Sequence, residues 1–266
     1  IAPYRNSAQL DLIPSNFIDN IIASKTFTPD LPGNFTGGSV NIQTKSLPER
    51  FVYNISLSSS YNDQASLVDN FLTFDAGSRA WLGFDDGTLA KPAALQDPAN
   101  LELIGSPVIA TSASRDDELA AVLDETTRSV NNQKAPTQRT APLNYSFSAD
   151  IGNQFLIGGK PLGVQAGINY SRNFSFFDDG QNNNFILGGG QATQLIENFQ
   201  LTETRATENP QLSGLAALSF KFNPNNEIKF ISLYSHSTEI NALFLEGIYP
   251  DYDIIEGELF QSRTLA

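Results

Sequence analysis

Apolar and polar residues alternate with a period of two along several long segments of this chain. The alternation is nearly unbroken over about 51–62, 143–155 and 162–176, and it returns over 211–222. Because successive side chains of a β-strand point to opposite faces, each segment predicts a strand with one apolar and one polar face. Arg172 is the one charge on the apolar face of the third segment.

Two further strands are expected. In 227–238, Ile228 and Phe230 share one face while Ile231 and Leu233 lie opposite, so this strand needs a bulge or a partly buried inner face. A sixth strand is expected to start near residue 257. We therefore expect a sheet of five to six strands.

The connections between these strands alternate in length. The first and third, 63–142 and 177–210, are long, whereas the second holds Gly158 and Gly159 and the fourth is the short turn 223–225. Long outer loops and tight periplasmic turns are typical of an outer-membrane β-barrel. The alternation of long and short connections therefore favours an antiparallel barrel.

The polar faces separate this barrel from a soluble antiparallel sandwich, which also alternates. A sandwich is expected to carry Lys, Glu and Thr on its solvent face. Here the polar faces of the first three strands consist of Ser, Asn, Gln and Gly, with Asp150 the only charge. Small neutral side chains suit a barrel interior, and Tyr and Phe near strand ends suit a lipid boundary.

Composition excludes several other classes of protein. The 29 acidic and 16 basic residues give a net charge of −13, so no basic surface is expected to neutralise nucleic-acid phosphates. The chain has no cysteine and a single histidine, His236, which argues against disulfides, thiol nucleophiles and His-based or thiolate metal centres. No stretch approaches the ~20 apolar residues of a membrane helix, so a membrane role would have to use strands.

Residues 1–47 are patterned differently. Ser15 is placed to cap a short helix that carries apolar residues at helical spacing (Phe17, Ile18 and Ile21). A strand over 21–27 and a turn-rich loop follow. Gly37 and Gly38 then precede an alternating strand, and paired glycines there imply positive φ or a close backbone approach.

Four pieces of this region carry a resemblance: LDLIP at 10–14, IDNIIASK at 18–25, PDLPG at 29–33 and TGGSVNIQTK at 36–45. Together they resemble the end of the plug domain of TonB-dependent outer-membrane receptors, where the plug closes before the first barrel strand. The segment 71–87, with FLTF and WLGFDDG, resembles the first long loop of a Bacteroidetes-type subfamily. The likeness covers 1–90 well and 140–240 in organisation.

The resemblance implies two domains. Residues 1–47 would be the α+β C-terminal part of the plug, with Gly37, Gly38 and Lys45 at its junction with the barrel. Residues 48–266 would be an all-β membrane barrel fragment, the first five to six antiparallel strands of about 22. Since the chain begins at Ile1 and contains no methionine, we expect an interior part of a longer protein.

Few residues are candidates for chemistry. The Asp-Asp-Gly tracts at 85–87 and 178–180 lack the spacing of a calcium loop and are expected to be turns. Residues 114–123 predict a capped amphipathic helix. His236 has no convincing Ser or Asp partner, so no catalytic residue, cofactor or metal is expected. Arg79 and Trp81 are candidates for ligand contact, although Trp81 as a loop anchor is the alternative.

The resemblance implies a non-enzymatic receptor in the outer membrane of a Gram-negative cell. Its function would be energised uptake of a scarce solute such as a siderophore, cobalamin, glycan or peptide. The implied partners are a TonB-type energy-transducing complex, lipid and lipopolysaccharide, and an extracellular ligand, but no nucleic acid. Two alternatives stay open: a surface binding or adhesion β-protein without transport, and a soluble all-β hydrolase.

Overall fold

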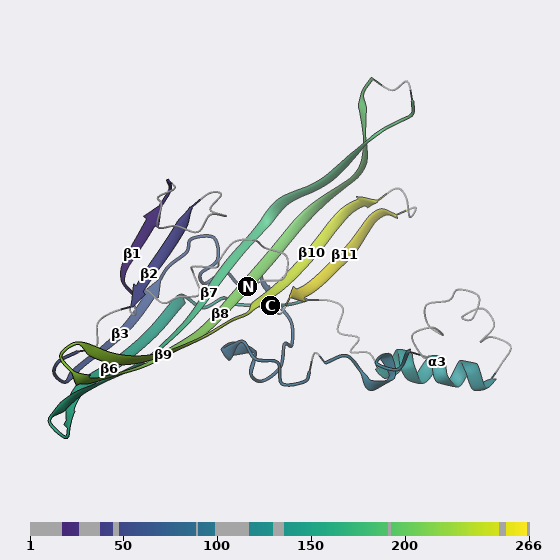
Figure 1. The fold of residues 1–266 in the computed structure, drawn as a ribbon. Helices are drawn as coiled ribbons and strands as arrows, with labels where there is room; N and C mark the ends of the chain where they lie inside the picture. The colour runs from purple at the N-terminus through teal and green to yellow at the C-terminus, as the bar shows by residue number, and fades with distance from the viewer. Residues whose placement is uncertain are drawn as a thin grey trace.

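The structure is a computed structural model, and it describes residues 18–26, 38–44, 48–88, 90–98, 117–129, 136–190, 193–249 and 254–264. Most of these residues lie in strands, with one α-helix and short 3₁₀ turns in the described part. The expectation of a β-rich chain is therefore confirmed. Figure 1 shows the long strands side by side in one twisted sheet.

This sheet has seven antiparallel strands in the order β11-β10-β8-β7-β6-β3, with β9 also paired to β8. The strands are β3 (Val52–Ser60), β6 (Asn144–Ile157), β7 (Lys160–Leu187), β8 (Leu195–Asn223), β9 (Asn226–Ser237), β10 (Glu239–Tyr249) and β11 (Ile254–Thr264). Five expected strands are confirmed as β3 and β6–β9, and the sixth is β11. Among the described residues, β3 forms one edge of an open sheet, and β9 and β11 form the other.

The strand β10 was not expected. It follows β9 directly and pairs with the same neighbour, β8. Gln211 pairs with Ser237 and Glu208 pairs with Ile240 in one unbroken register, so the gap between β9 and β10 lies opposite Pro210. Pro210 has no N–H to donate, but its carbonyl accepts a hydrogen bond from the Thr238 N–H at 3.1 Å. β9 and β10 are therefore one long strand, interrupted where its neighbour carries proline.

The expectation of a loop over 177–210 is wrong. β7 continues to Leu187 and β8 begins at Leu195, so most of this range forms a long hairpin. The register shifts between Phe177 and Gly180 and again after Asn184. Each bulge moves the following side chains to the other face, which breaks the period of two and conceals the strand in the sequence.

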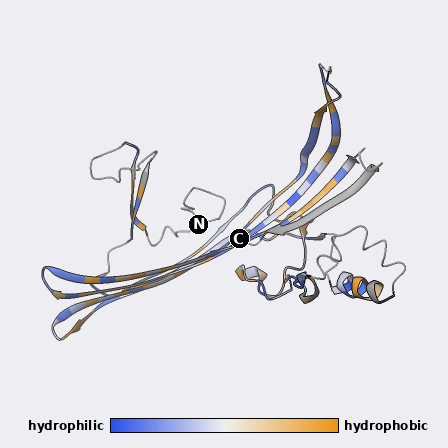
Figure 2. Cartoon of the chain, turned by 45° about the vertical axis from the view of Figure 1, so that its right-hand side comes forward, coloured by the Kyte–Doolittle hydropathy of each residue, from blue (hydrophilic) through white to orange (hydrophobic). Residues whose placement is uncertain are grey.

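The cross-strand register aligns side chains of one kind in rows. One row runs Ile55, Ala149, Ile168, Gly214 and Tyr234 across β3, β6, β7, β8 and β9. The adjacent row on the opposite face is entirely uncharged and polar: Ser56, Ser148, Asn169, Ser213 and Ser235. Figure 2 shows the resulting alternation of hydropathy along the strands. The sheet thus has an apolar face and, over β3, β6 and β7, a face of small polar side chains. On β8 and β9 this second face also carries the apolar pairs Leu215 with Leu233 and Ala217 with Ile231.

The connection 63–142 is structured where it is described. It contains β4 (Phe71–Thr73), η3 (Ala80–Leu82), η4 (Ala93–Leu95), α3 (Asp117–Ser129) and β5 (Thr137–Arg139). β4 and β5 pair antiparallel. The helix α3 confirms the helical part of the expectation for 114–123, whose first residues lie outside the described ranges, and it stands away from the sheet in both views (Figures 1 and 2).

Near the N-terminus, β1 (Ile18–Ser24) and β2 (Ser39–Thr44) form a separate antiparallel hairpin. Ile18 and Ile21 therefore lie in a strand, and the helix expected to carry them is wrong at these positions. The strand pairs Ile21 with Ile42 and Ala23 with Val40, which places these four residues on one face. Tertiary pairing with β2 outweighs the weak helical spacing. Ser15 and Phe17 lie outside the described residues.

We expect the turn between β6 and β7 to require residues that tolerate positive φ. Gly158 and Gly159 have φ of 59° and 74° and join the pair Ile157 and Lys160. Replacing both by valine should destabilise the protein by about 1–2 kcal/mol per site, because β-branched residues disfavour the left-handed region. Gly158→Asn is the matched control and should be tolerated. Urea unfolding in detergent micelles measures the difference, and equal stability of the two variants would contradict this account.

Candidate functional site

Residues 63–88 and 136–141, which include β4 and β5, form a covering segment. It packs on the apolar face of the sheet, over the outer halves of β7 and β8. Phe71 of β4 is 1% exposed and meets Phe174 edge to face, with ring centroids 5.8 Å apart, and also contacts Phe176 at 6.0 Å. Ala65, Ala141 and Ala206 complete this buried cluster. Small residues let the segment approach the sheet closely. The segment is thus a layer over one part of the sheet.

A cluster of charged residues lies beneath this layer. Glu208 of β8, whose side chain is 5% exposed, forms ion pairs with Arg172 of β7 and Arg139 of β5. Arg172 Nε donates to Glu208 Oε1 at 2.7 Å. Both guanidinium groups also lie over the Phe174 ring, at 5.3 Å for Arg172 and 5.8 Å for Arg139. One carboxylate therefore joins the covering segment to two strands of the sheet.

A second anchor lies at the break between β9 and β10. The Gly83 carbonyl accepts a hydrogen bond from Thr238 Oγ1 at 2.6 Å and is 2.7 Å from His236 Nε2. The His236 ring stacks on Phe84, with centroids 4.3 Å apart. A Cβ added at Gly83, where φ is 85°, would lie 2.9 Å from Thr238 Oγ1. The only histidine of the chain is thus part of a packing contact.

Arg79 and Trp81, the two candidates for ligand contact, lie in different surroundings. Trp81 is 48% exposed, its ring lies edge to face with Tyr170 at 6.0 Å, and its carbonyl accepts a hydrogen bond from the Tyr170 hydroxyl. Trp81 also lines a cleft of about 180 Å³ with Arg139, Arg172 and Glu208. Arg79 does not line this cleft; it is exposed and precedes η3. The contacts of Trp81 support its role as an anchor of the segment.

The first Asp-Asp-Gly tract forms a closed turn. The Asp86 carboxylate accepts hydrogen bonds from the hydroxyls of Thr88 at 2.6 Å and Ser78 at 2.7 Å, and from the N–H groups of both residues. These hydrogen bonds, led by that of the Thr88 hydroxyl, hold the pKa of Asp86 well below its usual range. Asp86 is thus an ionised turn residue, as expected of an Asx-rich turn.

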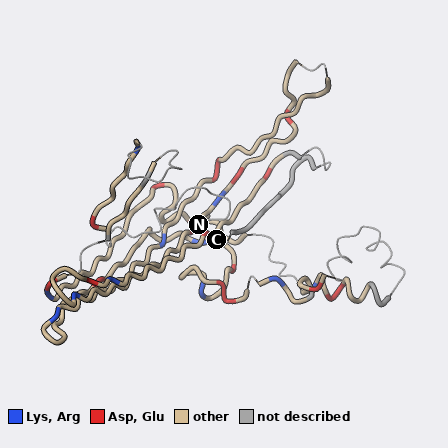
Figure 3. Tube along the Cα trace, in the orientation of Figure 1, with Lys and Arg blue, Asp and Glu red and all other residues tan. Residues whose placement is uncertain are grey.

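The second tract lies at the bulge of β7, where Asp178 and Asp179 fall between paired positions. The Asn70 amide approaches Asp178 at 3.5 Å, a long contact. No group of three His, Cys, Asp or Glu with the geometry of a metal site occurs among the described residues. Figure 3 shows Lys and Arg scattered along the trace rather than gathered on one surface.

The junction residues are only partly described. Gly37 and Lys45 lie outside the described residues. Gly38 is not among the positive-φ glycines, and a Cβ at Gly38 would lie 3.6 Å from the Ser24 carbonyl oxygen, an ordinary contact. The expectation that Gly38 needs positive φ or a close approach is therefore wrong. A glycine before β2 is compatible with ordinary extended backbone.

Sequence reasoning missed Glu208 and Arg139, because both lie in ranges expected to be loops. One signal was present: Arg172 stands alone as a charge on an apolar strand face, and a buried charge requires a partner. The sequence does not identify that partner, since Glu208 is one of 29 acidic residues.

Comparisons with protein-family models, curated proteins and solved structures return no match for this chain. In the described part of the chain, no helix has both the length and the apolarity to cross a membrane.

We expect Glu208→Gln to loosen the covering segment, because two guanidinium groups would lose their shared carboxylate. We expect the free energy of unfolding to fall by about 3 kcal/mol. This is the lower end of the range for breaking a buried ion pair, because the Arg139 side chain is 35% exposed. Asp124→Asn, which breaks the exposed pair with Arg128, is the control and should cost less than about 0.5 kcal/mol. Denaturant unfolding and limited proteolysis within 63–88 provide the measurements. Equal effects of both variants would mean that the buried cluster does not hold the segment.

Proposed function

We propose that this chain is part of a TonB-dependent outer-membrane receptor. Residues 48–266 would contribute the first strands of a transmembrane barrel of about 22 strands, and residues 1–47 the end of its plug. The whole receptor would take up a scarce solute from outside the cell, driven by a TonB-type energy-transducing complex. The observation that carries this proposal is the broad apolar face of the sheet, which stays exposed beyond the covering segment.

The exposed apolar face supports a lipid boundary. Its side chains remain accessible, including Leu57 at 79%, Ile55 at 68%, Phe230 at 61% and Ile168 at 45%. Soluble monomers rarely expose contiguous apolar surface of this kind, because it is unfavourable in water. The interior strands β6, β7 and β8 satisfy their backbone groups within the sheet, which is the condition for contact with hydrocarbon.

Strand length also agrees with a membrane span. β3 has 9 residues, and a tilted strand of about 9–11 residues crosses the hydrocarbon core. β7 and β8 have 28 and 29 residues, so they would project well beyond the bilayer. The covering segment packs on these projecting parts, and we assign that side to the cell exterior. The turns at Gly158–Gly159 and 224–225 would then face the periplasm.

The polar face supports contact with a movable plug. Its row includes Ser56, Ser148 and Asn169, whose uncharged hydroxyl and amide groups are exposed or half-buried. A hydrogen bond to such a group is worth about 1 kcal/mol net, because water replaces it when the partner leaves. A plug surface on this face could therefore detach at small cost.

A matched pair of charge substitutions tests the lipid boundary. Ile168→Lys places a cation on the apolar face, whereas Asn169→Lys places the same cation on the polar face of the same strand. We expect Ile168→Lys to weaken folding into lipid vesicles by about 2–4 kcal/mol and Asn169→Lys to have little effect. Urea titration of vesicle-folded protein measures both. If both variants fold equally well in buffer without lipid, the soluble alternatives replace this proposal.

The absence of cysteine allows the orientation to be tested directly. Ser78→Cys lies in the covering segment and Asn225→Cys in the turn between β8 and β9. An impermeant thiol reagent on whole cells should label the first variant and label the second only after the outer membrane is opened. The reverse pattern would invert the proposed orientation, and equal labelling of both variants would argue against a spanning sheet.

A further inference from the structure

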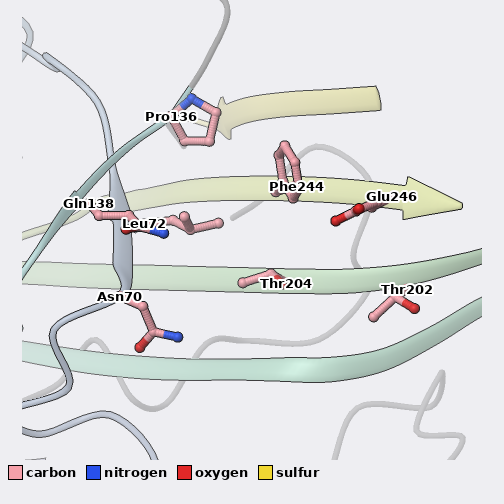
Figure 4. Close-up of a pocket in the computed structure, with 8 residues that line it drawn as sticks. All are labelled: Asn70, Leu72, Pro136, Gln138, Thr202, Thr204, Phe244 and Glu246. Atoms are coloured by element: carbon pink, nitrogen blue, oxygen red, sulfur yellow. The ribbon is translucent and has the colours of Figure 1, made fainter. Parts of the chain in front are cut away.

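A second cleft, of about 290 Å³, lies between the β4–β5 hairpin and the outer halves of β8 and β10. Figure 4 shows side chains entering it from different elements: Asn70 and Leu72 at β4, Thr202 and Thr204 on β8, and Phe244 and Glu246 on β10. The pairs Thr204 with Phe244 and Thr202 with Glu246 place these four residues on one sheet face. Leu218 lies on the same face, because no bulge interrupts β8 between Thr202 and Leu218.

Four of the polar side chains that line this cleft have no partner among the described residues, whereas Asn70 has only its long contact with Asp178. Within the described part of the chain, the side chains of Gln138, Thr202, Thr204 and Glu246 make no hydrogen bond or ion pair. Polar side chains from three separate elements thus converge on one concavity without satisfying one another. The floor is apolar, because Leu72 is 6% exposed and Phe244 packs against the buried cluster.

The chemistry of the lining limits the ligand. No Lys, Arg or His lines the cleft, so nothing in it would neutralise a phosphate or carboxylate. Amide and hydroxyl side chains both donate and accept hydrogen bonds, as the hydroxyl groups of a sugar do, and Glu246 adds an acceptor. The volume lies at the lower end of the roughly 300–1,000 Å³ of small-molecule sites, which suits one ring.

We propose that this cleft binds a neutral sugar ring. The apolar C–H face of the ring packs on Phe244, and its hydroxyl groups bond to Gln138, Thr204 and Glu246. The cleft opens on the face opposite the polar rows, so under the proposed function it lies outside the uptake path. The sugar is either free or the head of a glycolipid, since the cleft lies on the sheet face of the proposed lipid boundary, on the part that would project from the bilayer.

Saturation-transfer NMR tests this proposal on the chain folded in a sugar-free amine-oxide detergent. The probes are methyl β-glucoside, methyl β-galactoside and methyl N-acetyl-β-glucosaminide. We expect at least one to bind, and Thr204→Val and Glu246→Gln each to weaken binding about 3–10-fold by removing one hydrogen bond. Glu239→Gln, an exposed change on the same strand outside the cleft, is the matched control and should leave the affinity unchanged.

A second arm identifies the source of the sugar. Monoglucosyl-diacylglycerol in nanodiscs that binds more tightly than the methyl glucoside, with the same sensitivity to Thr204→Val, supports a lipid head. Binding of the methyl glycosides alone supports a free saccharide. The proposal is overturned if no glycoside binds, or if methylammonium binds instead and Glu246→Gln abolishes that binding. These results do not depend on membrane insertion, so the Ile168→Lys experiment remains a separate test of the proposed function.

Discussion

Backbone hydrogen bonds align β7 with β8 from Leu162 opposite Phe220 to Leu187 opposite Leu195. This ladder decides which face each later side chain occupies, because a slip of one residue would exchange the two faces. It brings Ile168 into line with apolar neighbours and Asn169 into line with Ser213. It also places Arg172 opposite Pro210, so that Glu208, two residues along β8 on the same face, lies within reach of the guanidinium group. The faces, the charged cluster and the cleft all follow from this register.

The covering segment shows how a long connection becomes ordered. Phe71 supplies the buried apolar contact, Glu208 joins Arg139 to Arg172, and the Gly83 carbonyl binds at the interruption opposite Pro210. A buried ion pair is weak evidence for net stability, because desolvation offsets much of the attraction. Its directional hydrogen bonds nevertheless fix where the segment sits. Placement, rather than added stability, is the main consequence of this cluster.

The proposal of membrane insertion and the proposal of transport are supported by different observations. The exposed apolar face argues for a hydrocarbon boundary whatever solute the protein handles. The proposal of energised uptake rests on the resemblance of 1–90 to plug-containing receptors. A surface-binding protein without transport would share the apolar face and the covering segment. Uptake that depends on an energy source is what would separate the two functions.

Much of the sheet was predictable from the sequence, because a period of two records which side chains share one face of a strand. β3, β6, β9 and the inner halves of β7 and β8 were located in this way, and the turn glycines 158 and 159 were recognised from their residue type. The sequence could not reveal the outer halves of β7 and β8, since bulges near Phe177 and Asn184 shift the period. It could not join Arg172 to Glu208 or assemble Gln138, Thr204 and Glu246 around one cleft. Those pairings are made across strands and loops far apart in the chain, so only the tertiary register decided them.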